Sequence, residues 1–153
     1  MIGIGSDHGG FHLKQTIIQH LKEKGYEVKD YGCYSEESCD YPVYAKAVAQ
    51  AVKKGEIDRG ILTCGTGIGI SIAANKIPSI RAAPCSDTFS ARAAKEHNHA
   101  NILALGERVV GKGLALDIVD TFLETEFSSD GRHIRRIEML KEINSMTANF
   151  ITE

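Results

Sequence analysis

Five short runs of β-forming residues alternate with amphipathic helical segments, and this alternation constrains the fold more than any other feature of the chain. The expected strands cover residues 1–6, 26–32, 59–65, 80–86 and 100–106. The expected helices cover residues 10–25, 41–55, 68–76, 87–98, 112–127 and 132–150. Such alternation builds right-handed βαβ units and a parallel sheet with helices on both faces. The pattern predicts an α/β fold, a Rossmann-like three-layer sandwich with a five-stranded parallel sheet and a C-terminal helix.

Apolar spacing and terminal residues support the individual elements. Leu13, Ile17 and Leu21 recur every four residues and form one face of a helix, which Gly25 is expected to end. Pro84 is expected to end the fourth strand, because proline cannot donate to a sheet ladder. We expect residues 1–153 to form a single domain.

Charge and composition exclude several classes of protein. A formal net charge of −2 argues against general binding to nucleic acid or membranes. No apolar run approaches the roughly 20 residues that span a bilayer. The N-terminus lacks the basic start and long apolar core of a signal peptide, so we expect a cytoplasmic protein. The four cysteines form no C-x-x-C pair and are expected to be free thiols: Cys33, Cys39, Cys64 and Cys85.

The loops that follow the strands are the candidate binding loops. Parallel sheets bind ligands beyond the carboxyl ends of their strands, near the point where the strand order reverses. One of these loops is a glycine turn, Gly65-Thr66-Gly67-Ile68-Gly69, at the start of a helix. Its N–H groups can attract an anion, or its glycines can merely allow close packing of helix on strand. The spacing matches neither the dinucleotide fingerprint nor the P-loop.

Cys64 directly precedes this turn. Free cysteine is often a core residue, and that interpretation stays open. A helix N-terminus nevertheless stabilises a thiolate. Such a thiolate can remove a carbon-bound proton while the turn amides stabilise the oxyanion that forms, so the position of Cys64 favours a catalytic role.

Asp7 and His8 end the first strand and should face the same crevice. Together they can move protons between sugar oxygens or hold a phosphate, whereas Asp7 alone can simply cap a helix. His8 and His12 are spaced like metal ligands, but no third ligand is evident and we expect no metal. His97 and Asn98 follow the fourth helix, where a lone histidine is commonly a surface or capping residue.

Arg132 and Arg136 stand four residues apart and can project from one helical face. Two guanidinium groups can clamp a phosphate through forked hydrogen bonds. Exposed basic residues are more often simply solvated, so this interpretation also needs support from elsewhere in the chain.

Six segments in a fixed order resemble the B-type ribose-5-phosphate isomerases, whose family also includes the subunits of galactose-6-phosphate isomerase. The segments are SDHGG (6–10), DYP (40–42), CGTGIGISIAANK (64–76), EHNHAN (96–101), GERVVG (106–111) and GRHIRR (131–136). The resemblance covers the chain through about residue 140, and the segment that starts at Cys64 is the most specific.

The resemblance implies a role for each site residue. Cys64 corresponds to the proton acceptor, and Gly65, Thr66, Gly67, Ile68 and Gly69 to the loop that binds the enediolate. His97 corresponds to the proton donor that opens the sugar ring, near Asp7, and Asn98 to a sugar contact. Four residues correspond to the phosphate site: His8, Arg108, Arg132 and Arg136. His99 and Arg135 stand where the family varies.

The resemblance also implies the activity and the assembly. The expected reaction interconverts ribose 5-phosphate and ribulose 5-phosphate through a cis-enediolate, without a metal or cofactor. The expected assembly is a homodimer, or a tetramer of two dimers, with each active site built from two subunits. The alternatives are an isomerase of allose 6-phosphate or galactose 6-phosphate, a non-catalytic phosphate- or nucleotide-binding module and, more weakly, a thiol redox protein.

Overall fold

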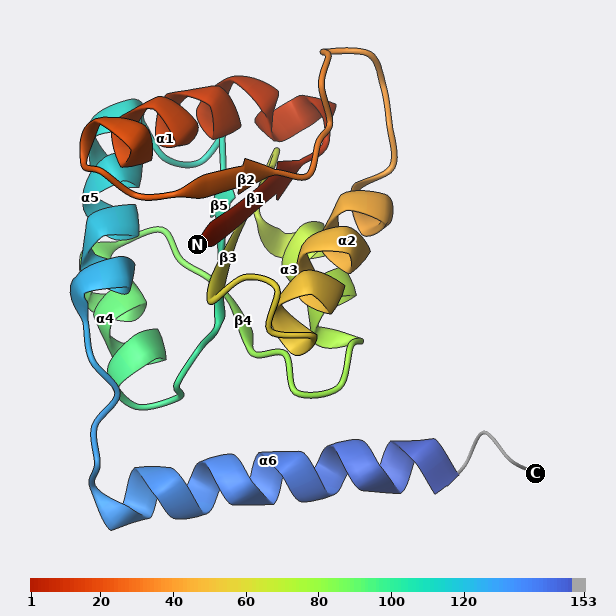
Figure 1. The fold of residues 1–153 in the computed structure, drawn as a ribbon, viewed down its shortest axis with the longest axis vertical. Helices are drawn as coiled ribbons and strands as arrows, with labels where there is room; N and C mark the ends of the chain where they lie inside the picture. The colour runs from red at the N-terminus through yellow and green to blue at the C-terminus, as the bar shows by residue number, and fades with distance from the viewer. Residues whose placement is uncertain (150–153) are drawn as a thin grey trace.

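The computed structural model describes residues 1–149, with side chains through residue 144. Five strands form one sheet: β1 (Ile2–Ser6), β2 (Val28–Asp30), β3 (Arg59–Cys64), β4 (Ala82–Pro84) and β5 (Ile102–Gly106). The helices are η1 (His8–Gly10), α1 (Phe11–Glu23), α2 (Tyr41–Lys53), α3 (Ile68–Asn75), α4 (Thr88–Glu96), α5 (Lys112–Glu124) and α6 (Gly131–Asn149). Every strand pairing is parallel, and the order is β2-β1-β3-β5-β4. The predicted α/β sandwich and its C-terminal helix are confirmed (Figure 1).

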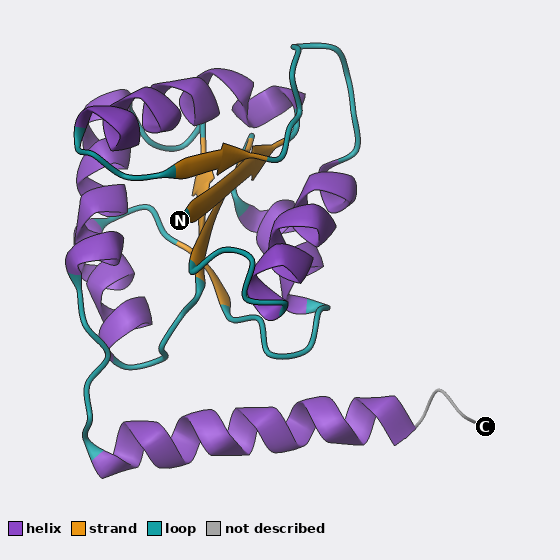
Figure 2. Cartoon of the chain, viewed as in Figure 1, coloured by secondary structure: helices purple, strands orange, loops and turns teal. Residues whose placement is uncertain are grey.

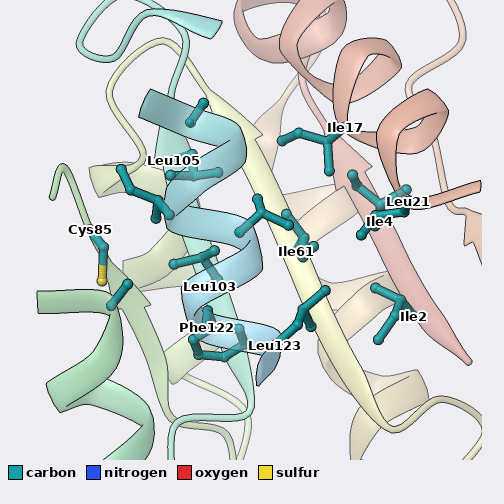
Figure 3. Close-up of a cluster of buried hydrophobic side chains, with 14 of the residues drawn as sticks. Ile2, Ile4, Ile17, Leu21, Ile61, Cys85, Leu103, Leu105, Phe122 and Leu123 are labelled. Carbon is teal, nitrogen blue, oxygen red and sulfur yellow. The ribbon is translucent and has the colours of Figure 1, made fainter. Parts of the chain in front are cut away.

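Two apolar clusters fill the space between the sheet and its helical layers. One joins the sheet to α1, α4 and α5, and its members include Ile4, Ile61 and Phe122, none of them accessible to solvent (Figure 3). The other joins the opposite face of the sheet to α2 and α3 through residues such as Val48 and Ile70. The strands therefore lie in the middle layer of the sandwich, as Figure 2 shows. Helix α6 runs separately, along one end of it.

Most element boundaries agree with the sequence pattern to within two residues. Pro84 is the last residue of β4, as expected. Gly25 follows the end of α1 with φ of +85°, a left-handed conformation that suits glycine. The short helix η1 was not expected. The last residue of the helix predicted over 132–150, Phe150, lies outside the described residues.

The strand order places three loops side by side at one edge of the sheet. The chain passes from β1 outward to β2 and then returns across β1 to β3, so the order reverses between β1 and β3. Ser6 lies opposite Thr63 in the register of these strands, and Cys64 lies opposite Gly106 of β5. The residues that follow β1, β3 and β5 consequently meet at the carboxyl edge.

Candidate active site at the carboxyl edge of the sheet

The structure divides the predicted site residues into two groups. The carboxyl-edge group follows β1, β3 and β5 and comprises Asp7, His8, Cys64, residues 65–69 and Arg108. The amino-edge group lies at the opposite ends of the strands and comprises His97, Asn98, Arg132 and Arg136. The first group contains the predicted base and its oxyanion donors, and the second contains the predicted ring-opening acid and the arginine clamp.

Cys64 is the last residue of β3, and its side chain is directed toward the glycine turn. The residue is 5% exposed. The N–H of Gly67 donates to its Sγ at 3.0 Å. This donor is aimed by the left-handed backbone of Gly67, whose φ is +78°. A Cβ there would also lie 2.9 Å from the carbonyl carbon of Leu105, so this glycine permits close packing of the turn on β5 as well as directing an amide at sulfur. Binding of an anion by the turn stays a prediction.

Arg108 supplies a cation over the same turn. The backbone N–H of Glu107 donates to the Cys64 carbonyl at 2.9 Å, and that of Arg108 donates to the Gly65 carbonyl at 3.1 Å. These bonds tie the loop after β5 to the turn after β3. A Cβ built on Gly65 would lie 3.2 Å from a terminal nitrogen of Arg108, which places the guanidinium directly over the turn. An anion bound here would meet a full positive charge as well as peptide N–H groups.

Asp7 and His8 form a third side of this site. Asp7 is buried, and its Oδ1 accepts from the N–H of Gly10 at 3.2 Å, so it does cap the short helix η1. Its position between β1 and the glycine turn is compatible with a second role. The Nδ1 of His8 accepts from the N–H of Cys39 at 3.2 Å, which leaves Nε2 as the nitrogen that carries a proton in the neutral ring.

Tyr41 is a neighbour of the glycine turn that the sequence analysis did not single out. A Cβ built on Gly69 would lie 2.9 Å from the Tyr41 ring, so the ring packs against the turn. Tyr41 is the first residue of α2. Its signal was its place in the DYP segment, at the start of the helix that directly precedes β3.

The amino-edge group is organised around a pair of stacked histidines. His97 directly follows α4 as its C-cap residue, and its ring stacks on that of His133 with centroids 4.6 Å apart and planes 8° from parallel. His133 is buried, and burial, followed by the charge of His97, lowers its pKa. Arg132 is exposed beside it and pairs with Asp130, with 3.3 Å between Nε and Oδ2.

The two groups cannot meet within one chain. Helix α4 runs antiparallel to the strands, so its last residues lie at the amino edge, where the carbonyl of Asn98 accepts from Nε of Arg81 just before β4. The strands between the two edges have the length of typical strands, about 17–20 Å. A small sugar phosphate held at Cys64 does not span that length. The arginine clamp and His97 therefore lie away from the Cys64 of their own chain.

Two further properties of the described residues complete this description. No helix among them is long and apolar enough to cross a membrane. No group of three or more His, Cys, Asp or Glu side chains in the described part of the chain is arranged to hold a metal ion.

These features define an α/β protein with a thiol and oxyanion donors at the switch point of its sheet. The profile of the Ribose/Galactose Isomerase family matches residues 2–140. The chain is 53% identical over 142 residues to ribose-5-phosphate isomerase B of Escherichia coli, covering 93% of this chain and 95% of that protein. The chain belongs to the Ribose/Galactose Isomerase family.

Two other relatives extend the comparison. The structure of ribose-5-phosphate isomerase B from Clostridium thermocellum superposes with a TM-score of 0.94 at 60% identity, covering 95% of this chain and 98% of that one. The galactose-6-phosphate isomerase subunit LacB of Clostridium acetobutylicum is 42% identical over 149 residues, which are 97% of this chain and 84% of that one. Both five-carbon and six-carbon sugar phosphates thus occur among the substrates in the relatives' names.

Proposed function

We propose that this protein is a ribose-5-phosphate isomerase of type B, a single isomerase domain acting on the phosphorylated sugar without a cofactor. The observation that carries the proposal is the contact between Cys64 Sγ and the Gly67 N–H at the start of α3. It joins a proton acceptor to the oxyanion donors that an enediolate needs. The high identity to ribose-5-phosphate isomerases over nearly the whole chain supports the choice of substrate.

The reaction divides between the two residue groups. His97, supplied by a second copy of the chain and placed near Asp7 of the site, moves the proton that opens the furanose ring, and Asn98 of that copy contacts the sugar. The Cys64 thiolate then removes the proton from C2 of the open aldose, and the C1 carbonyl becomes the oxygen anion of a cis-enediolate. The amides of residues 65–69 and the Thr66 hydroxyl stabilise that anion. Transfer of the O2 proton to O1, and return of the carbon-bound proton to C1, give the ketose.

The phosphate is held away from the reacting carbons. Four cationic or polar side chains take this role in the proposal: His8, Arg108, Arg132 and Arg136. Binding energy from a remote phosphate positions C1 and C2 against the thiol, so it contributes to the barrier of the chemical step as well as to affinity.

The proposed working form is a homodimer, alone or paired into a tetramer, in the cytoplasm. The separation of the two residue groups supports it, because a second copy can bring its amino-edge group to the Cys64 of the first. Apolar side chains that a partner can cover lie beside the glycine turn, where Ile68 and Ile72 are 56% and 55% exposed on α3. Helix α6 likewise exposes Ile134, Leu140 and Ile143.

Isomerisation of a six-carbon sugar phosphate is the second candidate, favoured by the similarity to the galactose-6-phosphate isomerase subunit. Comparison of kcat/KM for ribose 5-phosphate with that for allose 6-phosphate and galactose 6-phosphate decides between them. The sugar phosphate with the highest kcat/KM identifies the reaction. Phosphate binding without turnover of any of the three would instead identify a non-catalytic module.

Replacement of Cys64 tests the proposed base. We expect purified Cys64→Ala to lose about 100- to 10,000-fold in kcat for ribose 5-phosphate, because positioned proton transfer contributes rate factors of that size. Cys85→Ala is the matched control, since Cys85 is a buried thiol outside both residue groups. An unchanged turnover number in Cys64→Ala would remove Cys64 from this role.

A further inference from the structure

Two more cysteines lie beside the candidate site, and the proposed reaction uses neither of them. Cys33 and Cys39 belong to the loop over residues 31–40, between β2 and α2, at the same edge of the sheet as Cys64. Figure 1 shows this loop as the long excursion ahead of α2. Neither cysteine is in a disulfide, and Cys39 alone among the four cysteines is not buried.

Cys33 is fixed to the end of β1. Its N–H donates to the Ser6 carbonyl at 2.8 Å, and its Sγ lies 3.7 Å from the Ser6 hydroxyl. The fully buried ammonium group of Lys14 donates to the Cys33 carbonyl at 2.5 Å and to Asp30 at 2.7 Å. These bonds hold Cys33 against the core, beside Ser6, the residue that precedes Asp7.

The Cys39 side chain reaches back to Cys33 from the other end of the loop. The Cys39 thiol acts electrostatically on both the Cys33 thiol and the Tyr44 hydroxyl and raises the pKa of each. Five residues separate the two cysteines in sequence, so a bond between their sulfur atoms would close a short loop. Both ends of this loop are tied to the end of β1, because the Cys33 N–H donates to Ser6 and the Cys39 N–H donates to His8, two residues further on.

The environments of the two thiols differ. Cys33 is 4% exposed, and burial raises the pKa of its thiol. Cys39 is half-buried and open to a small reagent from solvent. An accessible thiol near a second, protected thiol is the arrangement in which a first oxidation product is captured as a disulfide.

We propose that Cys33 and Cys39 form a reversible oxidation site, which closes to a disulfide in the presence of hydrogen peroxide and restrains the active-site loop. The Cys39 sulfur attacks one peroxide oxygen, which breaks the O–O bond, releases water and leaves a sulfenic acid. The Cys33 sulfur then attacks Cys39, the S–O bond breaks and a second water leaves. The two thiols together lose two electrons, and one molecule of peroxide accepts them. A dithiol restores both thiols by exchange.

The disulfide would act on the site through two neighbours of Cys39. The Cys39 N–H is the donor to His8, and Tyr41, two residues later, packs against Gly69 of the glycine turn. A covalent link to the fixed Cys33 pulls this segment and changes both contacts. This effect on turnover rests on the proposed isomerase function, whereas formation of the bond does not.

Peptide mapping tests the bond itself. Cys64→Ala protein is treated with hydrogen peroxide, alkylated, digested without reductant and analysed by mass spectrometry. We expect a linked peptide pair joining Cys33 to Cys39, which disappears after treatment with dithiothreitol. Cys85 should remain a free thiol, since burial raises its pKa to about 11. Recovery of Cys33 and Cys39 as unlinked or over-oxidised peptides would overturn the proposal.

Kinetics test the consequence. We expect peroxide to lower kcat/KM of the wild-type protein several-fold and dithiothreitol to restore it. Cys33→Ser and Cys39→Ser should keep wild-type kcat/KM before treatment and lose the dithiothreitol-recoverable part of the response. If the disulfide is mapped but kcat/KM is unchanged, the proposal that the bond restrains the active-site loop is wrong. Absence of isomerase activity in the reduced wild-type protein would overturn the proposed function, and the peptide map would still decide on the bond.

Discussion

His133 is a buried histidine stacked on a second histidine, and its environment disfavours the charged form. Burial is the main cause of its lowered pKa, followed by the charges of His97 and Arg132, while Asp130 acts in the opposite direction. In the unfolded chain a histidine has a pKa of about 6.5, so between that value and the lower folded value the unfolded state binds more protons. The stability associated with neutral His133 is therefore complete above about pH 6.5 and decreases as the pH falls.

We expect the Tm of the wild-type protein to fall more between about pH 7 and pH 5 than that of His133→Phe, which keeps a ring to stack on His97 but cannot titrate. The measurement is thermal unfolding at matched ionic strength across this range. His99, whose pKa is also lowered by burial, is common to both proteins, so its contribution cancels in the difference. Parallel Tm profiles would show that His133 does not sense pH.

At the scale of elements, the contact between η1 and the end of β3 determines where Cys64 lies. A Cβ on Gly10 would approach the Thr63 carbonyl carbon to 2.4 Å and the Cys64 nitrogen to 2.6 Å. Backbone lies directly against backbone here, so neither side can yield by a change of side-chain rotamer. The Thr63 hydroxyl donates to the Gly10 carbonyl at 2.7 Å and ties the two elements together.

We expect Gly10→Ala to lower the free energy of unfolding by about 1–3 kcal/mol, the usual cost of overpacking, and to lower kcat by displacing Cys64. Urea unfolding and steady-state kinetics measure the two effects. Gly113→Ala is the control, because nothing lies within 4 Å of a Cβ there and alanine suits helix α5. Equal stability of Gly10→Ala and the wild-type protein would contradict this account of the contact.

The helices and strands also show how much of the molecule could be predicted from its sequence. Apolar spacing and turn residues act locally, so the alternation of elements, the end of β4 at Pro84 and the parallel sheet followed from them. The helix η1 was not predicted, because three residues are too few to show a periodic apolar pattern. Its one sequence signal was Asp7 as a possible cap, and that residue was also a candidate for catalysis. The contact of Tyr41 with Gly69 was not predicted because it joins two helices, α2 and α3, whose packing against each other is not encoded in the local pattern of either.

For the whole molecule, the resemblance implied a role for each site residue but did not say at which edge of the sheet that residue lies. Strand direction makes that assignment: residues after β1, β3 and β5 lie at one edge, and residues after α4 and α5 lie at the other. The stacking of His97 on His133 then places the start of α6 at the amino edge as well. One chain therefore holds two halves of the proposed site that face different directions.

Mixing two inactive variants tests whether a second copy supplies the missing half. Cys64→Ala alters only the carboxyl-edge group and His97→Ala only the amino-edge group, so each homodimer has two defective sites. In a hybrid dimer, one site combines both substitutions and the other combines the intact Cys64 of one chain with the intact His97 of its partner. With random pairing, half of the dimers are hybrids with one intact site of two, and we expect about a quarter of the wild-type activity.

The two variants are unfolded together in denaturant, refolded at equal concentrations and assayed with ribose 5-phosphate, beside each variant refolded alone. Size-exclusion chromatography verifies that the mixture has the same oligomeric state as the wild-type protein. Activity that appears only in the mixture can arise only from a site shared between chains, because neither chain carries both intact residues. A mixture no more active than its components would place the proton donor and the base in the same chain, against the separation that the sheet imposes on them.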